Sequence, residues 1–358
     1  MKCNIIFVIL LLQMDNITAL DTLIAGASKI SVSVHIHPDG DALGSGLALV
    51  SYLSKLRGKD AVLLVPDSVP ESLAFMLDGF ENGSALTCRD DLNGVKDRIS
   101  GSDLLFCLDC SSFSRSGEEM EKELRSSSAA KVLIDHHLNP EAESFGTVFS
   151  ETGISSTCEL LFRILKEMPD VGGDITKLPS ECLESLMTGM TTDTNNFSNS
   201  VFPGTLAMAS ELLAAGVDRD RILSDLYHNY RENRLRLMGY LLDRNLEITP
   251  EGTAFMILDK AVQERFDFRQ GESEGFVNMP LAIARVRMSI LLTEEEGRFR
   301  VSIRSKEGTS ANACAMRYFN GGGHEMAAGG KLFFPENIPS PEDAKAYILK
   351  VSEEFLAR

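Results

Sequence analysis

Four short segments of this 358-residue sequence gather the acidic and imidazole side chains that could do chemistry. They are His35-Ile36-His37-Pro38-Asp39-Gly40-Asp41, Asp109, Asp135-His136-His137, and Asp193 within Thr191-Thr192-Asp193-Thr194. Five of the six histidines fall in motifs of this kind, the fifth being His324, and His228 is interpreted as structural. Carboxylates gathered at one place repel one another unless cations neutralise them. The combination therefore predicts a site for divalent metal ions.

Mixed oxygen and imidazole ligands favour Mn²⁺, with Mg²⁺ or Co²⁺ as alternatives, and the lack of thiolates argues against a structural zinc site. Two such ions, about 3.5–4 Å apart, can activate water and hold a phosphoryl group. Each segment alone has a simpler explanation, because Asp39-Gly40-Asp41 could be a turn and an aspartate at a strand end could cap a helix. Taken together, the segments favour metal binding.

The elements that must position these segments are predicted from apolar runs. Runs at 30–34, 61–65, 104–108 and 132–134 are predicted strands, with helices at 42–56 and 118–125 between them. Apolar strands that alternate with helices predict an α/β protein with a parallel sheet covered on both faces. Ligands of such sheets bind beyond the carboxyl ends of the strands, and polar motifs follow three of the four runs. The site is expected at that edge.

The second half of the chain has a different pattern. Segments near 156–167, 178–190, 204–215, 218–229 and 231–245 have helical periodicity. After these, strands are predicted at 253–258, 284–292 and 299–303, and a helix at 341–356. The sequence therefore predicts a doubly wound, mostly parallel domain at 14–215, a helical connector at 216–245 and a smaller α/β domain at 246–358.

The net charge of −17 argues against a protein that grips duplex DNA, because such binding needs a basic face. It is compatible with a small anionic substrate held by a few basic groups and by metal ions. Seven scattered cysteines fit a reducing compartment and no disulfide framework. Cys107-Leu108-Asp109-Cys110 lies on a predicted strand, so a redox role is disfavoured.

The apolar run at residues 5–12 resembles a short signal segment, but no small-residue cleavage site follows it. Residues 1–13 are interpreted as an extension that precedes a start at Met14, with a helix to about Ala27. A cytoplasmic location is preferred, and secretion is the minority alternative. No segment is long and apolar enough to cross a membrane.

The motif set resembles the DHH phosphoesterase superfamily. The resemblance is carried by His-x-x-Pro-Asp-Gly-Asp-Ala-x-Gly-Ser at 35–45, Asp-His-His at 135–137 and Asp-Thr at 193–194. Ser302-Ile303-Arg304-Ser305-Lys306 and Gly321-Gly322-Gly323-His324 are similar to the DHH-associated C-terminal domain. From about residue 15 to the end, the domain pair most resembles bacterial nanoRNase/pAp-phosphatase enzymes.

The resemblance implies a role for each residue of the site. His35, Asp39 and Asp109 would hold one metal ion, while Asp41, His136 and Asp193 would hold the second, with Asp109 bridging. Asp135 would orient His136 by accepting its other N–H. His137 would face the substrate phosphate. His37 receives no role, and Asn195 stands where relatives commonly have glycine.

Between residues 281 and 306, six lysines and arginines stand against three glutamates. They are Arg285, Arg287, Arg298, Arg300, Arg304 and Lys306. Alternation on strands would place Arg285 and Arg287 on one face, and Arg298 and Arg300 are interpreted as part of a solvated face. Arg304, with Ser305 beside it, matches the position that binds substrate in the family.

The run Gly321-Gly322-Gly323-His324 could be a helix C-cap or an anion site. The anion site is preferred, with backbone N–H groups of Gly322 and Gly323 near a phosphate and the His324 imidazole as a further donor. Arg115 is a weaker phosphate candidate.

The resemblance implies 3′→5′ hydrolysis of oligoribonucleotides a few residues long, and removal of phosphate from 3′-phosphoadenosine 5′-phosphate (pAp), in a cleft between the domains. Expected partners are short single-stranded RNA or a small nucleotide, without duplex DNA or membrane, and a homodimer is left open. Hydrolysis of a cyclic or linear dinucleotide is the nearest alternative. Inorganic pyrophosphatase and long-strand exonuclease are disfavoured, and a non-catalytic nucleotide-binding regulator represents a different class.

Overall fold

A computed structural model describes residues 16–356. The chain divides into two compact units, and the boundary in the sequence falls between His228 and Asn229. The extension predicted at 1–13 lies outside the described residues. The connector predicted at 216–245 is divided by the boundary, since α8 (Arg219–Tyr227) belongs to the first unit and α9 (Glu232–Tyr240) to the second. Within residues 16–356, no helix has the length and apolar character needed to span a membrane.

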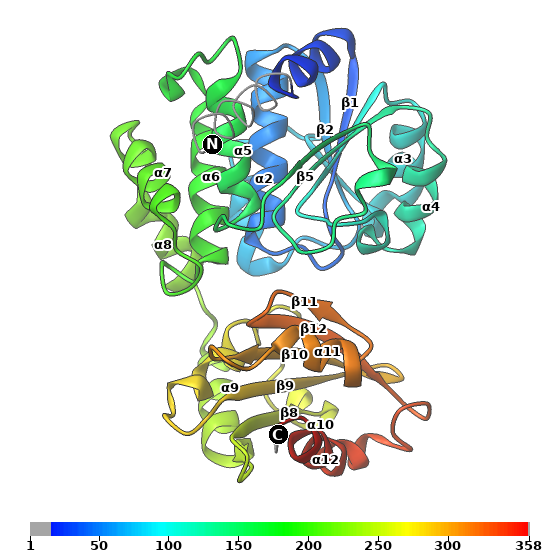
Figure 1. Cartoon of the computed structure of the whole chain (residues 1–358), viewed down its shortest axis with the longest axis vertical. Helices are drawn as coiled ribbons and strands as arrows, with labels where there is room; N and C mark the ends of the chain where they lie inside the picture. Colours follow the sequence, from blue (N-terminus) through cyan, green and yellow to red (C-terminus); the bar gives the residue numbers. More distant parts are fainter. Residues whose placement is uncertain (1–15, 357–358) are drawn as a thin grey trace, which may run out of the picture. The chain divides into compact units, whose positions relative to one another are not determined.

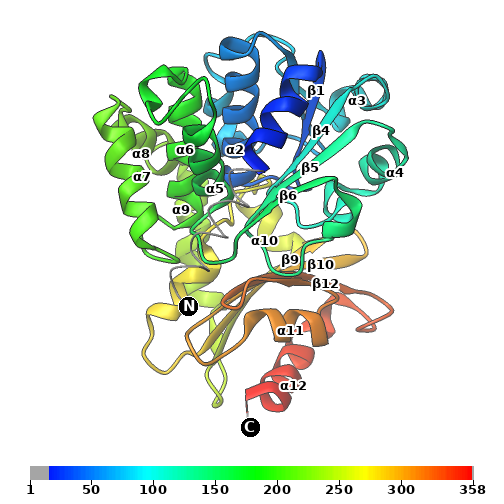
Figure 2. The same cartoon turned by 45° about the horizontal axis from the view of Figure 1, so that its top comes forward.

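The first unit is a doubly wound sheet of six parallel strands (Figure 1). The predicted parallel α/β fold is confirmed, but the two edge strands, at 85–87 and 147–150, were not predicted. In sheet order the strands are β3 (Ala85–Thr87), β2 (Asp60–Val65), β1 (Lys29–Ser33), β4 (Leu104–Leu108), β5 (Ala130–Asp135) and β6 (Thr147–Ser150). The central strands β1, β4 and β5 are buried along almost their whole length, because helices cover both faces. Figure 2 shows β1, β4, β5 and β6 lying side by side.

Helices on the two faces bury two separate cores. One face packs against α2 (Gly40–Ser51), α5 (Thr157–Glu167) and α6 (Ser180–Asp193), with α7 (Pro203–Ala214) and α8 outside them. The other face packs against α3 (Cys88–Ser100) and α4 (Glu118–Ser126). Residues 16–26 form a further helix before β1. The strands are buried between these two layers of helices. Because the strands are parallel, their carboxyl ends all lie at the same polar edge of the sheet.

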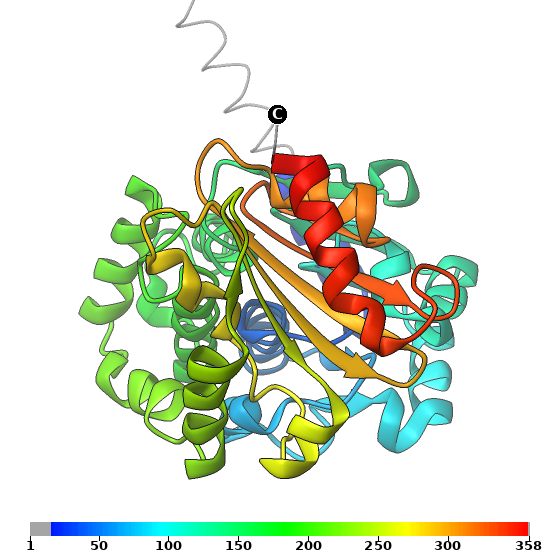
Figure 3. The same ribbon diagram turned by 90° about the horizontal axis from the view of Figure 1, so that it is seen from below.

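The second unit holds a six-stranded sheet that is antiparallel except where β8 and β9 run in parallel. In sheet order its strands are β11 (Gly322–Gly323), β12 (Ala327–Phe333), β10 (Arg298–Ser305), β9 (Met288–Glu295), β8 (Thr253–Leu258) and β7 (Glu247–Ile248). The helices α11 (Ala311–Tyr318) and α12 (Ala344–Leu356) pack on one face, and α12 runs across the strands as the red helix of Figure 3. The helices α9 and α10 (Lys260–Arg265) belong to a second apolar cluster.

The strand predicted at 284–292 begins only at Met288. Before it, residues 276–282 form a 3₁₀ helix, and the Val286 N–H donates to the carbonyl of Ile283 in a turn. Arg285 and Arg287 therefore do not share a strand face, and that prediction was wrong. The β-branched and apolar residues of this segment continue the strand pattern in sequence, but their backbone hydrogen bonds close a turn.

Candidate metal centre

The polar edge of the first sheet has a natural binding position at its centre. The strands β1 and β4 are neighbours, but the chain proceeds from β1 toward β2 and β3, and from β4 toward β5 and β6. In open α/β sheets such a switch point leaves a crevice beyond the carboxyl ends of the two strands. His35 follows β1 and Asp109 follows β4, so the fold places them on the two sides of this crevice.

One group of ligand atoms comes from His35, Asp39 and Asp109, which lie within 4.8 Å of one another. His35 Nε2 is 3.3 Å from Asp109 Oδ2 and 3.8 Å from Asp39 Oδ1. The Asp39 carboxylate is held because it caps α2, accepting from the N–H groups of Asp41 and Ala42 at 3.0 Å each. These are the three residues to which the family resemblance assigned one metal ion.

The second group is Asp41, His136 and Asp193, again within 4.8 Å. His136 Nε2 lies 3.5 Å from Asp193 Oδ2 and 3.8 Å from Asp41 Oδ2. The residues come from the first turn of α2, the end of β5 and the last position of α6. The structure thus brings all six predicted ligands together in the two predicted groups.

Asp109 lies between the two groups. Its Oδ2 faces His35, while its Oδ1 is 3.5 Å from His136 Nε2. The backbone of Asp109 has φ +53°, a left-handed conformation that costs a non-glycine residue free energy and occurs at functional sites. This geometry suits a carboxylate that bridges two cations.

The N-terminus of α5 was not part of the predicted site, yet it holds two of its carboxylates. The N–H groups of Thr157 and Cys158 donate to Asp41 at 2.7 and 2.9 Å, and Thr157 Oγ1 donates to Asp109 Oδ1 at 3.0 Å. Free N–H groups at a helix N-terminus favour bound negative charge. The run Ser155-Ser156-Thr157, followed by Glu159, is an N-cap signal that predicts this helix start but not its partner.

Asp135 contacts a different histidine from the one predicted. Its Oδ1 is 2.8 Å from His137 Nδ1, and its Oδ2 accepts the backbone N–H of His137 at 3.1 Å. The buried carboxylate therefore fixes the ring of His137, the residue that the sequence assigned to the substrate phosphate. The bond predicted from Asp135 to His136 stays a prediction.

Charges within the cluster shift its pKa values in opposite directions. Burial lowers the pKa of His35, but hydrogen bonds to Asp109 and Asp39 outweigh it and raise that pKa well above 6.5. Burial, together with the charges of Asp109 and Asp39, raises the pKa of Asp41 well above its ordinary value. Burial acts against the ionised form of Asp109, yet the electrostatic interaction with His137 and the His35 hydrogen bond hold the pKa of Asp109 well below 3.8. Protons and imidazolium charge thus neutralise carboxylates that divalent cations would neutralise when bound.

Close packing of α2 on α6 sets the distance between Asp41 and Asp193. An ideal Cβ on Gly44 would lie 2.6 Å from the carbonyl oxygen of Ser185, and one on Gly189 would lie 3.0 Å from that of Gly40. The two helices could not approach this closely with larger residues. The glycine of the Ala-x-Gly-Ser motif, Gly44, therefore allows α2 and α6 to pack closely.

The backbone conformation of the turn after Asp193 explains why asparagine is tolerated at position 195, where relatives commonly have glycine. Asn195 has φ +46° and Asn196 has φ +54°, a region where asparagine is among the better tolerated residues. Asparagine can therefore replace the commoner glycine without displacing Asp193.

Two further residues near the first motif have defined surroundings. His37 has φ +55° and its Nδ1 lies 2.7 Å from Asp67 Oδ2, so it secures the loop between β1 and α2. The backbone carbonyl of Arg115 accepts the Ile36 N–H at 2.7 Å, which places its short 3₁₀ segment beside the same loop. A phosphate contact of the Arg115 side chain stays a prediction.

In the second unit, Arg304 lies at the end of β10, where its side chain is half-buried. Ser305, predicted beside it as a substrate contact, is buried, and its hydroxyl donates to the carbonyl of Thr309 at 2.6 Å. The Ser305 hydroxyl therefore uses its proton in a hydrogen bond within the turn after β10, and a substrate contact of Ser305 stays a prediction.

The glycines before His324 also have internal partners. The N–H of Gly323 donates to Asn312 Oδ1 at 2.9 Å, and that of His324 donates to Ala327 at 2.8 Å. An ideal Cβ on Gly321 would overlap the Gly329 carbonyl, and one on Gly323 would lie 2.6 Å from that of Ala327. The glycines let the chain lie close against β12, which neither the C-cap nor the anion-site interpretation predicted.

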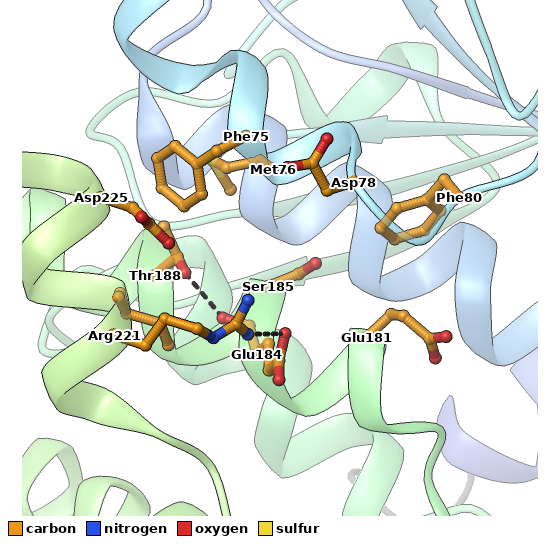
Figure 4. Close-up of a pocket in the computed structure, with 11 residues that line it drawn as sticks. Phe75, Met76, Asp78, Phe80, Glu181, Glu184, Ser185, Thr188, Arg221 and Asp225 are labelled. Carbon is orange, nitrogen blue, oxygen red and sulfur yellow. Dashed lines mark hydrogen bonds and ion pairs between the residues drawn. The ribbon is translucent and has the colours of Figure 1, made fainter. Parts of the chain in front are cut away.

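A small pocket lies apart from the metal centre, between residues 71–80, α6 and α8 (Figure 4). Acidic residues dominate its polar lining, and its one guanidinium, Arg221, is paired with Glu184. None of the predicted site residues lines it. The pocket does not belong to the candidate centre.

Comparison with known proteins matches the same two regions. A model of the DHH family, N-terminal domain, matches residues 29–190, and a model of the DHHA1 domain matches residues 257–357. A solved structure of an exopolyphosphatase-related protein from Bacteroides fragilis is 34% identical, with a TM-score of 0.86, over 96% of this chain and 97% of that one. The chain belongs to the DHH family. Membership makes it a hydrolase of the phosphoesterase type.

Two curated relatives have printed activities. The bifunctional oligoribonuclease and PAP phosphatase NrnA of Bacillus subtilis is 26% identical over 84% of this chain and 88% of that protein. The protein of the same description from Thermus thermophilus is 29% identical over 87% and 86%. Both alignments span the two units.

Proposed function

We propose that this chain is a phosphoesterase dependent on two divalent cations, Mn²⁺ foremost, which hydrolyses oligoribonucleotides a few residues long and releases phosphate from pAp. The observation that supports the proposal most is the pair of ligand groups on either side of Asp109. The relatives described as oligoribonuclease and PAP phosphatase, similar over both units, support the substrate class.

The donor set fits hard divalent cations. It consists of carboxylates and imidazoles, and the Cys158 thiol beside Asp41 is uncharged, because burial and then the charge of Asp41 raise its pKa well above 9.0. His35, Asp39 and Asp109 would hold one ion, and Asp41, His136 and Asp193 the other, with Asp109 shared. When bound, the ions supply Lewis acidity toward a phosphoryl group and toward water.

The protein's own residues orient these groups and the substrate. Thr157 fixes one oxygen of Asp109, and the α5 N-terminus fixes both oxygens of Asp41, so the carboxylates cannot turn away. Asp135 fixes the orientation of the His137 ring through Nδ1, and His137 would contact a phosphate oxygen of the substrate. In the second unit, Arg304 and His324 would contact the anionic nucleotide, with Gly322 and Gly323 shaping the strand beside them.

A substrate panel tests the proposal. Full-length protein, stripped with EDTA and reloaded with Mn²⁺ or Mg²⁺, is incubated with di- to pentaadenylate, pAp, pApA, cyclic di-AMP and pyrophosphate. Release of AMP from the oligonucleotides and of phosphate from pAp, lost again with EDTA, is expected. Turnover of cyclic di-AMP or pApA alone would establish the dinucleotide phosphodiesterase instead.

The regulator alternative requires a different readout. A non-catalytic nucleotide-binding protein would bind pAp without turning over any compound of the panel, and Asp109→Ala would then have no activity to remove. That result would overturn the proposed function.

A further inference from the structure

One face of β10 and β12 carries a concentration of cations in an otherwise acidic chain. Burial alternates along β10, so Arg298, Arg300, Ser302 and Arg304 share the face opposite to the apolar core. In the antiparallel register Arg300 stands directly across from Lys331, and Arg304 across from Ala327. The sequence interpreted Arg300 as part of a solvated face, but its cross-strand partner was not visible there.

Like charges opposite each other destabilise a sheet pair, so the Arg300–Lys331 pairing needs a compensating anion. Glu295 compensates it only in part, since its carboxylate accepts from Arg298 at 2.8 Å and lies 3.4 Å from Arg300. For Lys331, an exposed residue, no carboxylate of residues 16–356 lies within ion-pair distance. The face therefore keeps uncompensated positive charge.

Small residues separate the cations. Ser302 pairs with Gly329 between the Arg300–Lys331 and Arg304–Ala327 pairs, and Gly329 is exposed. No large side chain of β10 or β12 lies between the two cationic positions on this face. With about 3.3 Å per residue, Arg300 and Arg304 are about 13 Å apart along β10.

We propose that this face, through Arg300 and Lys331, binds phosphates of an oligonucleotide beyond the nucleotide that Arg304 contacts. Phosphates repeat along a single strand, and a basic stripe of separated cations is the electrostatic feature that follows such a backbone. The inference rests on the proposed function and deepens it, because the extra contacts favour a chain of nucleotides over a mononucleotide such as pAp.

The test compares wild type with Arg300→Gln/Lys331→Gln in the full-length protein. For pentaadenylate, kcat/KM is expected to fall about tenfold or more, while turnover of pAp stays within about twofold of wild type. The slope of log affinity against log salt should become shallower by about 1.4, which is about 0.7 for each lost phosphate contact on a single strand. Lys350→Gln on α12, whose side chain is 68% exposed, is the matched control and should change neither value.

A binding measurement keeps the inference testable even without turnover. Anisotropy of fluorescein-labelled pentaadenylate in EDTA should show weaker binding by the double variant, and oligoglutamate of equal charge should not displace the label. Unchanged binding and kcat/KM in a protein that hydrolyses pAp would overturn this inference and leave the proposed function intact. Displacement by oligoglutamate would point to an acidic peptide and would also overturn it.

Discussion

The candidate metal centre of the first unit and the cationic face of the second differ in how they present charged side chains. At the centre, the polar groups of His35, Asp41, Asp109 and His136 are almost completely buried and come from four elements. On the face of β10 and β12, arginine and lysine side chains are half-buried or exposed, and strand register places them beside one another. A buried cluster fixes geometry for chemistry, whereas flexible side chains at an open surface adapt to a substrate.

The comparison predicts that changes in the first unit act on turnover and changes in the second act on substrate affinity. The largest effect is expected for Asp109→Asn, which removes the shared charge while keeping the shape and the Thr157 hydrogen bond. Activity should fall by more than the roughly 10²- to 10³-fold that losing one stabilising donor costs. Binding of pentaadenylate in EDTA should not change.

The exposed Asp220→Asn on α8 serves as the control for Asp109→Asn and should retain full activity. An Asp109→Asn protein that turns over pAp within tenfold of wild type would show that this carboxylate is not at the centre of the reaction.

Arg304→Gln should act in the opposite way. Loss of a charge-assisted hydrogen bond to a phosphate raises KM for pAp by about 10- to 100-fold, while kcat changes less. The amount of Mn²⁺ bound per chain, measured by titration calorimetry, should stay at the wild-type value. A fall in bound Mn²⁺ would mean that Arg304 affects metal binding as well as substrate affinity, which would contradict the comparison.

The substitution Thr157→Val tests how the N-terminus of α5 supports the metal ligand Asp109. The variant keeps the backbone N–H that donates to Asp41 but removes the hydroxyl that donates to Asp109. Loss of such a supporting hydrogen bond weakens metal affinity by about 10- to 100-fold. Thr157→Ser should restore it, and failure of serine to do so would assign the effect of valine to packing.

The smallest effect is a dependence of metal affinity on pH. Burial lowers the pKa of His35, but hydrogen bonds to Asp109 and Asp39 outweigh burial and raise it, and burial raises the pKa of Asp41. Both groups therefore hold protons that a cation must displace. Affinity for Mn²⁺ should weaken by about tenfold per pH unit for each proton released as pH falls from 8 to 6. Calorimetry in buffers of different ionisation enthalpy measures the protons directly.

Stability of the metal-free protein should change in the opposite sense. A group whose pKa is raised on folding stabilises the fold below its unfolded pKa, and this stabilisation is lost as pH rises through the folded pKa. For His35 that window opens at about 6.5, so the EDTA-treated protein should have a higher Tm at pH 6 than at pH 8, and Mn²⁺ should raise Tm more at pH 8. A metal-free Tm that rises with pH would contradict this.

The sequence predicted the fold and the clustered ligands because each depends on local patterns. Apolar runs ended at His35, Asp109 and Asp135, and the rule for parallel sheets brought these ends together. The strand β12 escaped prediction, because Ala327–Phe333 contains two glycines and no apolar alternation. Its position in the sheet is defined by its antiparallel pairing with β10.

Contacts made by distant residues were also not visible in the sequence. Thr157 holds Asp109 from 48 residues away, and the partner of Asp135 depends on a ring orientation that only the folded chain defines. The internal hydrogen bonds of Gly323 and Ser305 likewise arise from tertiary packing. Residue types indicated which chemistry was available, and the fold determined which groups are committed to structure.

The claim that two cations share Asp109 is tested most directly by titrating the EDTA-stripped, full-length protein with Mn²⁺ in a calorimeter. We expect two ions per wild-type chain, and one for His35→Gln, because that substitution removes a ligand from one group only. Wild-type protein that takes up no Mn²⁺, or a His35→Gln variant that still takes up two with unchanged affinity, would contradict the account.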